Sequence, residues 1–131
     1  MSKDWQQDID DLMLNFGHEI HAKPKMPSED TLQLRMKLIA EESQELLEAL
    51  EEGDLPHIAK ELADVLVVTI GCASALGIDM NPVWDIVHDS NMAKIGGPVD
   101  PETGKQLKPE GWKPPDIESE IKRQLEQSCK K

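Results

Sequence analysis

The sequence predicts an all-α protein, and three observations support that prediction. Helix-forming residues such as Leu, Glu, Lys, Gln, Ala and Met dominate the chain, whereas aromatic residues make up only 3% of it. Apolar residues recur at intervals of three and four, which is the period of an amphipathic helix. Glycine and proline gather mostly between these segments. We therefore expect a bundle of about four principal helices, followed by a C-terminal arm and a short terminal helix.

The first predicted helix covers residues 4 to about 18. Its apolar face carries, three and four residues apart, Trp5, Ile9, Leu12, Met13 and Phe16. We expect Trp5 and Phe16 to lie in the core or at an interface. The connector that follows contains His18 and His21, which we interpret as surface histidines because no third metal ligand accompanies them.

The second predicted helix runs from a cap at Ser28 or Thr31 to about Glu52. Its buried positions should be Leu32, Leu34, Leu38, Ile39, Leu46, Leu47 and Leu50. Gly53 is a favourable helix stop, and Pro56 restarts a helix at once. Because the link is so short, the second and third helices should be antiparallel neighbours.

The third predicted helix, at about 55 to 76, is the most apolar segment. Its second half carries no charge, so it should be buried on most sides. A fourth helix should open at Asn81 and continue to about Lys94. The segment 96–115 is rich in Pro, Gly and Lys and predicts an ordered loop or arm. A last short helix, weakly amphipathic, should follow Asp116.

The length of 131 residues suits one domain. We divide it into an N-terminal helix and connector at 1–27, a metal-binding helical core at 28–95 and a C-terminal arm at 96–131. A single domain this small would struggle to cover so apolar a third helix, so we expect a homodimer at least.

The net charge of −12 argues against binding to a nucleic acid polymer or to an anionic membrane surface. No apolar run approaches the ~20 residues of a membrane span. The polar N-terminal residues are not those of a signal peptide. We therefore expect a cytoplasmic protein, with Cys72 and Cys129 as reduced thiols.

Five carboxylates gather on the second and third predicted helices. Residues three or four apart share a helix face, so Glu42 pairs with Glu45, and Glu61 pairs with Asp64. Glu41 precedes the first pair. Two antiparallel helices would bring these acids around one point, where a hard divalent cation such as Mg²⁺ would relieve their repulsion.

A solvated helix face is the alternative interpretation, and we accept it for Glu48, Glu51 and Glu52. Asp64 argues against it for the other acids, because it stands at the start of an uncharged run where a buried, unpaired carboxylate would be costly. Lys60 is near in sequence, but we expect it to lie on another face. The pattern alone does not decide between a metal site and a solvated face.

The sequence E-E-S-Q-E at 41–45, followed by E-L-A-D at 61–64, resembles the E-E-x-x-E … E-x-x-D pattern of the all-α nucleoside triphosphate pyrophosphohydrolases. These are the MazG-like proteins, with relatives among dimeric dUTPases and phosphoribosyl-ATP pyrophosphohydrolase. D-S-N-M-A-K at 89–94 and G-K-Q-L-K-P-E-G-W-K-P-P-D-I at 104–117 are similar to the segments that follow the metal helices in such proteins. The resemblance covers most of residues 12–117.

The resemblance implies Mg²⁺-dependent hydrolysis of (deoxy)nucleoside triphosphates to the monophosphate and pyrophosphate, for nucleotide house-cleaning or pool balancing. Mn²⁺ would be the substitute metal. By motif position, Glu42, Glu45, Glu61 and Asp64 would hold the metal. Glu41 and Glu42 would be catalytic, with Glu41 a further ligand or the group that orients or deprotonates the attacking water. Relatives also imply a homodimer or a dimer of dimers.

The resemblance further implies that Asn91 and Lys94 contact the substrate, with Lys94 at a phosphate. Alternatively, Lys94 only complements the dipole of its helix. Lys105, Lys108 and Lys113 could close over the phosphates or could be solvated. Trp112 could cover the base or pack on a neighbouring subunit. For Trp5 and Phe16, the resemblance leaves a place near the base as the alternative to the core or an interface.

Two other functions stay open. Phosphoribosyl-ATP hydrolysis in histidine synthesis ranks lower because residues 89–117 look MazG-like. A non-catalytic helical interaction module would make the acids a solvated face.

Overall fold

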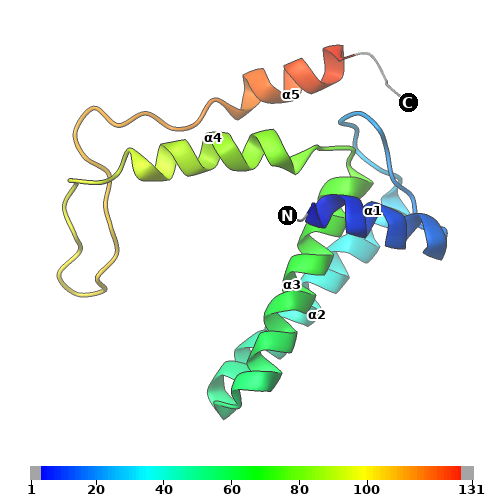
Figure 1. Cartoon of the computed structure of the whole chain (residues 1–131), viewed down its shortest axis with the longest axis horizontal. Coiled ribbons are helices and arrows are strands. Elements are labelled where there is room, and N and C mark those ends of the chain that lie inside the picture. The colour runs from blue at the N-terminus through cyan, green and yellow to red at the C-terminus, as the bar shows by residue number, and fades with distance from the viewer. Residues whose placement is uncertain (1–3, 128–131) are drawn as a thin grey trace. The chain divides into compact units, whose positions relative to one another are not determined.

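The structure, a computed structural model, describes residues 4–127. Its helices are α1 (Trp5–Phe16), α2 (Glu29–Glu52), α3 (Leu55–Ala75), α4 (Met80–Met92) and α5 (Ile117–Glu126), as Figure 1 shows. The described residues contain no β-strand beyond one isolated bridge, so the all-α prediction is confirmed. The chain divides after Asp79 into two compact units, the first with α1 to α3 and the second with α4 and α5. The single-domain organisation stays a prediction, and Cys129 lies outside the described residues.

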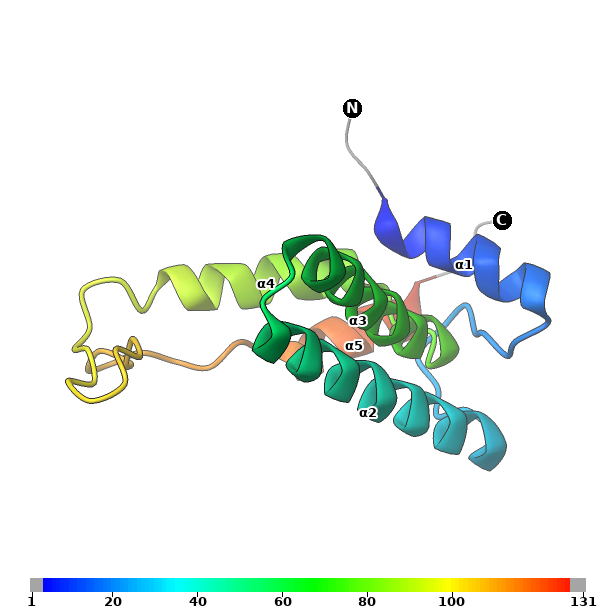
Figure 2. The ribbon, with the colours of Figure 1, turned by 90° about the horizontal axis from the view of Figure 1, so that it is seen from below.

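An antiparallel hairpin of α2 and α3 forms the first unit's frame, which can be followed in Figures 1 and 2. Ser28 is the cap of α2, because its Oγ accepts a hydrogen bond from the Thr31 N–H at 3.2 Å. Gly53 ends α2 with a left-handed φ of 81°, and Pro56 lies in the first turn of α3. The predicted limits of both helices are confirmed.

The small core of the first unit lies where α1 packs on the C-terminal half of α3. Ile9, Met13 and Ala75 are buried there. The amide of Gln6 donates to the Ile78 carbonyl at 2.8 Å, which ties α1 to the end of α3. α1 thereby holds its position by both apolar packing and a hydrogen bond.

The burial predicted for the long helices is wrong in part. On α2, Leu34, Leu47 and Leu50 are exposed, and on α3 so are Leu62, Leu66 and Val67. The buried residues of α3 are Glu61, Gly71, Ala73, Ser74 and Ala75. The reason is that α1 covers only one part of α3, so its first half presents an apolar face without cover in this unit. Trp5 and Phe16 are also mostly exposed, so the core interpretation is wrong for both of them.

No single described helix is long and apolar enough to cross a membrane, although α3 and α4 meet the length and composition when taken together as a broken pair.

α4 and α5 pack against each other in the second unit and run in opposite directions (Figure 1). The intervening arm is ordered, as predicted. The Asp100 N–H donates to the Lys105 carbonyl at 2.9 Å, and the Gln106 amide donates to the Gly97 carbonyl at 2.9 Å. Asp116 caps α5 by accepting from the Ser119 N–H at 3.0 Å.

Glu19 organises the connector between α1 and α2. Its carboxylate accepts from the Ser28 hydroxyl at 2.7 Å and from the Ser28 N–H at 3.2 Å, and lies 2.7 Å from His21 Nε2. Hydrogen bonds from Ser28, Thr31 and His21 lower the pKa of Glu19 to about 2. His21 and His18, predicted as surface histidines, are both half-buried, and His18 contacts Arg35.

We predict that Glu19→Ala lowers the Tm at pH 7 by about 3 °C or more, because it removes the acceptor that holds Ser28. A carboxyl whose pKa is lowered on folding stabilises the protein above its ordinary pKa of 4.5, and this stability is lost as the pH falls toward 2. The gap in Tm between wild type and Glu19→Ala should therefore narrow between pH 6 and pH 3 in thermal melts. Glu51→Ala, an exposed change on α2, is the control and should show no such pH dependence.

Candidate functional site

Three of the predicted acids meet where α2 packs against α3. Glu42 and Glu45 lie one turn apart on α2, and Glu61 faces them from α3. One carboxylate oxygen of each residue lies within 4.8 Å of the others. The antiparallel hairpin predicted from the Gly53 link is therefore what gathers them. We call Glu42, Glu45 and Glu61 the acid cluster.

Buried oxygens without hydrogen-bond partners distinguish this cluster from a solvated helix face. Glu61 is only 4% exposed. Its Oε2 lies 3.2 Å from His57 Nε2 and 3.5 Å from Lys60 Nζ, but its Oε1 has no partner. Oε1 of Glu42 is also buried without a partner. Because leaving buried carboxylate oxygens unsatisfied is costly, these atoms fit the role of ligands to a cation.

The surroundings of Glu42 shift the pKa of its carboxyl group. Burial raises the pKa of the Glu42 carboxyl, and the negative charges of Glu45, Asp64 and Glu61 raise it further. Ionising all of these acids together is therefore unfavourable without a compensating positive charge.

Asp64 corrects one expectation from the sequence. Lys60 Nζ lies 2.7 Å from Asp64 Oδ2, so the prediction that Lys60 lies on another face is wrong. Residues four apart on a helix share a face, and this spacing should have indicated the ion pair. Asp64 is also one-third exposed, not buried and unpaired as its sequence context suggested. Glu41 is exposed, and neither it nor Asp64 belongs to the acid cluster.

Sequence reasoning also missed His57. Its Nε2 lies 3.2 Å from Glu61 Oε2, and its Nδ1 lies 3.4 Å from Glu52 Oε1. The signal was present, since His57 precedes Glu61 by four residues, as Lys60 precedes Asp64. One basic residue thus stands one turn before each acid of α3.

The second unit brings together three of the predicted substrate-binding residues. Trp112 Nε1 donates to the Ser90 carbonyl at 2.9 Å, which fixes the indole against α4 of the same chain. Lys94 Nζ lies 5.3 Å from the indole ring centroid, and Lys108 Nζ lies 4.8 Å from it. Such cation–π contacts gather two ammonium groups around one aromatic ring.

The other two predicted substrate-binding residues take no part in these ring contacts. Asn91 is exposed on α4, one turn before Lys94, and Lys105 is exposed in the arm. Both side chains are accessible to a bound molecule.

Comparison with known proteins identifies the family. A search among curated proteins gave no match. The family model for phosphoribosyl-ATP pyrophosphohydrolase (PRA-PH) matches residues 9–91, which is more than half of the chain and includes all of the acid cluster. The chain therefore belongs to this family, within the MazG-like all-α nucleoside triphosphate pyrophosphohydrolase superfamily, and is a nucleotide pyrophosphohydrolase, a hydrolase that acts on acid anhydrides.

Proposed function

We propose that the protein hydrolyses (deoxy)nucleoside triphosphates to the monophosphate and pyrophosphate with Mg²⁺, for which Mn²⁺ can substitute. The observation that carries this proposal is the acid cluster, with its two buried and partnerless oxygens on Glu42 and Glu61. Carboxylate oxygens are the ligands that Mg²⁺ prefers. Asp64 would complete the ligand set by giving up its ion pair with Lys60 and binding the cation instead.

The chemistry needs no protein nucleophile. When bound, a divalent cation neutralises phosphate charge and lowers the pKa of water. The water oxygen forms a bond to phosphorus, and the α–β anhydride bond breaks. Attack at the α phosphorus expels pyrophosphate, whereas attack at the β phosphorus expels the nucleoside monophosphate, so both give the same two products. Glu41, exposed beside the cluster, would orient or deprotonate the water.

We assign the second unit to substrate binding. Lys94 and Lys108 would contact phosphates, because Trp112 holds both ammonium groups within about 5 Å of one ring. Asn91 and Lys105 are accessible and would add contacts to the sugar and phosphates. Trp112 itself would position these cations, since its own N–H is already bonded to Ser90.

A homodimer or a dimer of dimers is part of this proposal. The exposed apolar residues on the hairpin include Leu47, Leu50, Leu55, Leu62, Leu66 and Val67. A soluble protein rarely leaves such a patch open, and a second copy would cover it. The family's named substrate, phosphoribosyl-ATP, ranks below nucleoside triphosphates because residues 89–117 resemble MazG-like segments.

We predict that the purified protein releases pyrophosphate from at least one NTP or dNTP with Mg²⁺, and that EDTA abolishes this release. Glu45→Ala and Asp64→Ala should each lower kcat by about 1,000-fold, because each removes a proposed ligand, while circular dichroism shows unchanged helicity. Glu48→Ala, an exposed acid on the same helix, is the control and should keep full activity.

The panel of substrates should include phosphoribosyl-ATP. Full activity in both ligand variants would mean that the site is misplaced. No metal-dependent release from any nucleotide would leave the chain a non-catalytic helical module.

We predict that Glu42→Gln raises the Tm of the metal-free protein by about 2 to 4 °C at pH 7.5. A carboxyl whose pKa is raised on folding contributes stability below its ordinary pKa of 4.5 and loses it as the pH rises through the raised value. At pH 7.5 the ionised Glu42 therefore destabilises the fold, and glutamine removes this charge. Mg²⁺ should raise the Tm of the wild type more than that of Glu42→Gln in thermal melts. Equal shifts would argue against Glu42 as a ligand.

We predict that Lys94→Met lowers kcat/KM for the preferred nucleotide by about 10- to 100-fold, because it removes a charge-assisted bond to phosphate. Lys113→Met, at an exposed lysine of the same arm, should change it less than about 2-fold. Steady-state kinetics on both variants gives the two changes in kcat/KM to be compared. Equal effects would mean that the arm acts only through its total charge.

A further inference from the structure

Lys60 contacts two of the proposed metal ligands at once, and the proposed function gives it no role beyond the loss of one ion pair. Its Nζ lies 2.7 Å from Asp64 Oδ2 and 3.5 Å from Glu61 Oε2. The side chain of Lys60 is 65% exposed, whereas that of Glu61 is 5% exposed. An exposed ammonium group thus covers the outer side of an acidic site whose inner side is buried.

The ion pairs of Lys60 leave the inner oxygens of this site without compensation. Oε1 of Glu42 and Oε1 of Glu61 are buried without hydrogen-bond partners. The oxygen of Glu61 that Lys60 approaches is the other one, Oε2. A divalent cation held by the inner oxygens and by Asp64 would need a carboxylate that Lys60 already occupies. Lys60 and the divalent cation therefore compete for Asp64.

Repulsion between the two positive charges strengthens this competition. An ammonium group and a divalent cation that share Glu61 would lie only a few ångströms apart, beside buried groups that screen charge poorly. The divalent cation should therefore drive Lys60 away from Asp64. Because coupling between two binding events is reciprocal, Lys60 should in turn weaken the binding of the cation.

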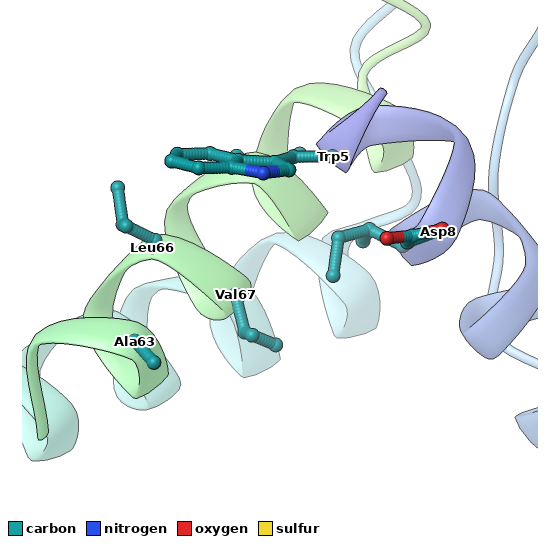
Figure 3. Close-up of a pocket in the computed structure, with 7 residues that line it drawn as sticks. Trp5, Asp8, Ala63, Leu66 and Val67 are labelled. Carbon is teal, nitrogen blue, oxygen red and sulfur yellow. The ribbon is translucent and has the colours of Figure 1, made fainter. Parts of the chain in front are cut away.

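The displaced ammonium group of Lys60 has no other carboxylate to contact on its own helix, because α3 carries no acid besides the two that the cation would take. Part of the surface of α3 is apolar. Ala63 and Leu66 line a hollow of about 340 Å³ beside Trp5 of α1 (Figure 3). An ammonium group gains no partner from these apolar side chains. Lys60 therefore needs a new anion when the cation binds.

Arg35, the buried cation of the hairpin, is held in place and cannot change partners in this way. It is 4% exposed, and its Nη2 donates to His18 Nδ1 at 3.2 Å. A Cβ at Gly71 would lie 2.7 Å from Arg35 Nη1, so the opposing helix has room for the guanidinium only while it carries glycine there. Arg35 also borders a cavity of about 220 Å³ between α1, α2 and α3. The exposed Lys60, in contrast, is free to rotate.

We propose that Lys60 is an exchangeable internal cation. It occupies Asp64 in the metal-free protein, gives Asp64 up when a divalent cation binds, and then contacts a phosphate of the substrate. This inference rests on the proposed function. A triphosphate carries more negative charge than one divalent cation neutralises, so a lysine beside the metal ligands binds part of the remainder. A phosphate that holds Lys60 away from Asp64 also makes metal and nucleotide bind cooperatively.

This role predicts effects of opposite sign on two affinities. Lys60→Met removes the competitor and should tighten Mg²⁺ binding by about 3- to 10-fold, measured by calorimetry without nucleotide. The same change removes a phosphate contact. It should therefore weaken the binding of a non-hydrolysable nucleotide in saturating Mg²⁺ by about 10- to 100-fold. The probes are the α,β-methylene analogues of ATP, GTP, CTP and dUTP, of which the one that the wild type binds most tightly is used.

Two matched variants control for charge and for folding. Lys60→Arg keeps the positive charge and should stay within about 3-fold of the wild type in both measurements. Lys37→Met removes the same charge from an exposed position of α2 and should change neither affinity by more than about 2-fold. Misfolding of Lys60→Met cannot imitate the expected result, because a disrupted hairpin would weaken Mg²⁺ binding.

The outcomes separate this inference from the proposed function. Equal Mg²⁺ affinity in Lys60→Met and the wild type overturns the inference, as does weaker Mg²⁺ binding in the variant, which would give Lys60 a structural role only. Tighter Mg²⁺ binding with unchanged analogue binding overturns the contact with phosphate. These results leave the proposed function intact, since it requires only that Mg²⁺ binds and that a nucleotide is hydrolysed. Absence of Mg²⁺ binding in every variant contradicts the proposed function as well.

Discussion

The packing of α2 against α3 in antiparallel register is the constraint on which the acid cluster depends. Glu42 and Glu45 belong to α2 and Glu61 belongs to α3. The hairpin brings one carboxylate oxygen of each within 4.8 Å of the others. The link is short, because Gly53 ends one helix and Pro56 lies in the first turn of the next. The short link thereby fixes which face of α3 is turned toward α2, and with it the position of Glu61.

Holding like charges together has a cost that the surrounding residues partly offset. His57 and Lys60 contact Glu61, and Lys60 also contacts Asp64. Neither reaches the buried Oε1 atoms of Glu42 and Glu61. The fold thus neutralises the outer side of the cluster and leaves its inner oxygens available. This incomplete compensation suits the proposed binding of a cation.

The sequence predicted the helices well because their limits are local. Ser28, Gly53 and Pro56 act within one turn of the helix ends that they define. Burial was predicted less well, since Leu47 or Leu66 is covered only if another helix lies above it, and hydrophobicity does not say which one does. The acid cluster was predictable once the hairpin was assumed.

The Lys60–Asp64 pair was predictable from spacing and was missed. The burial of Arg35 was not predictable, because its surroundings come from α1, α3 and the connector together. Likewise, no local pattern indicated that Lys94 and Lys108 would both lie over the ring of Trp112. Contacts between distant segments depend on tertiary packing, which a single sequence does not display.

The different attachments of the three helices have an evolutionary consequence. α2 and α3 are locked by their short link, so a substitution that shifts their phase would displace the acids and Gly71 together. α1 is joined by a longer connector held at Glu19, and it contributes Ile9, Met13 and Phe16 to the cavity wall. Divergence in α1 can therefore reshape the cavity while the acids keep their geometry.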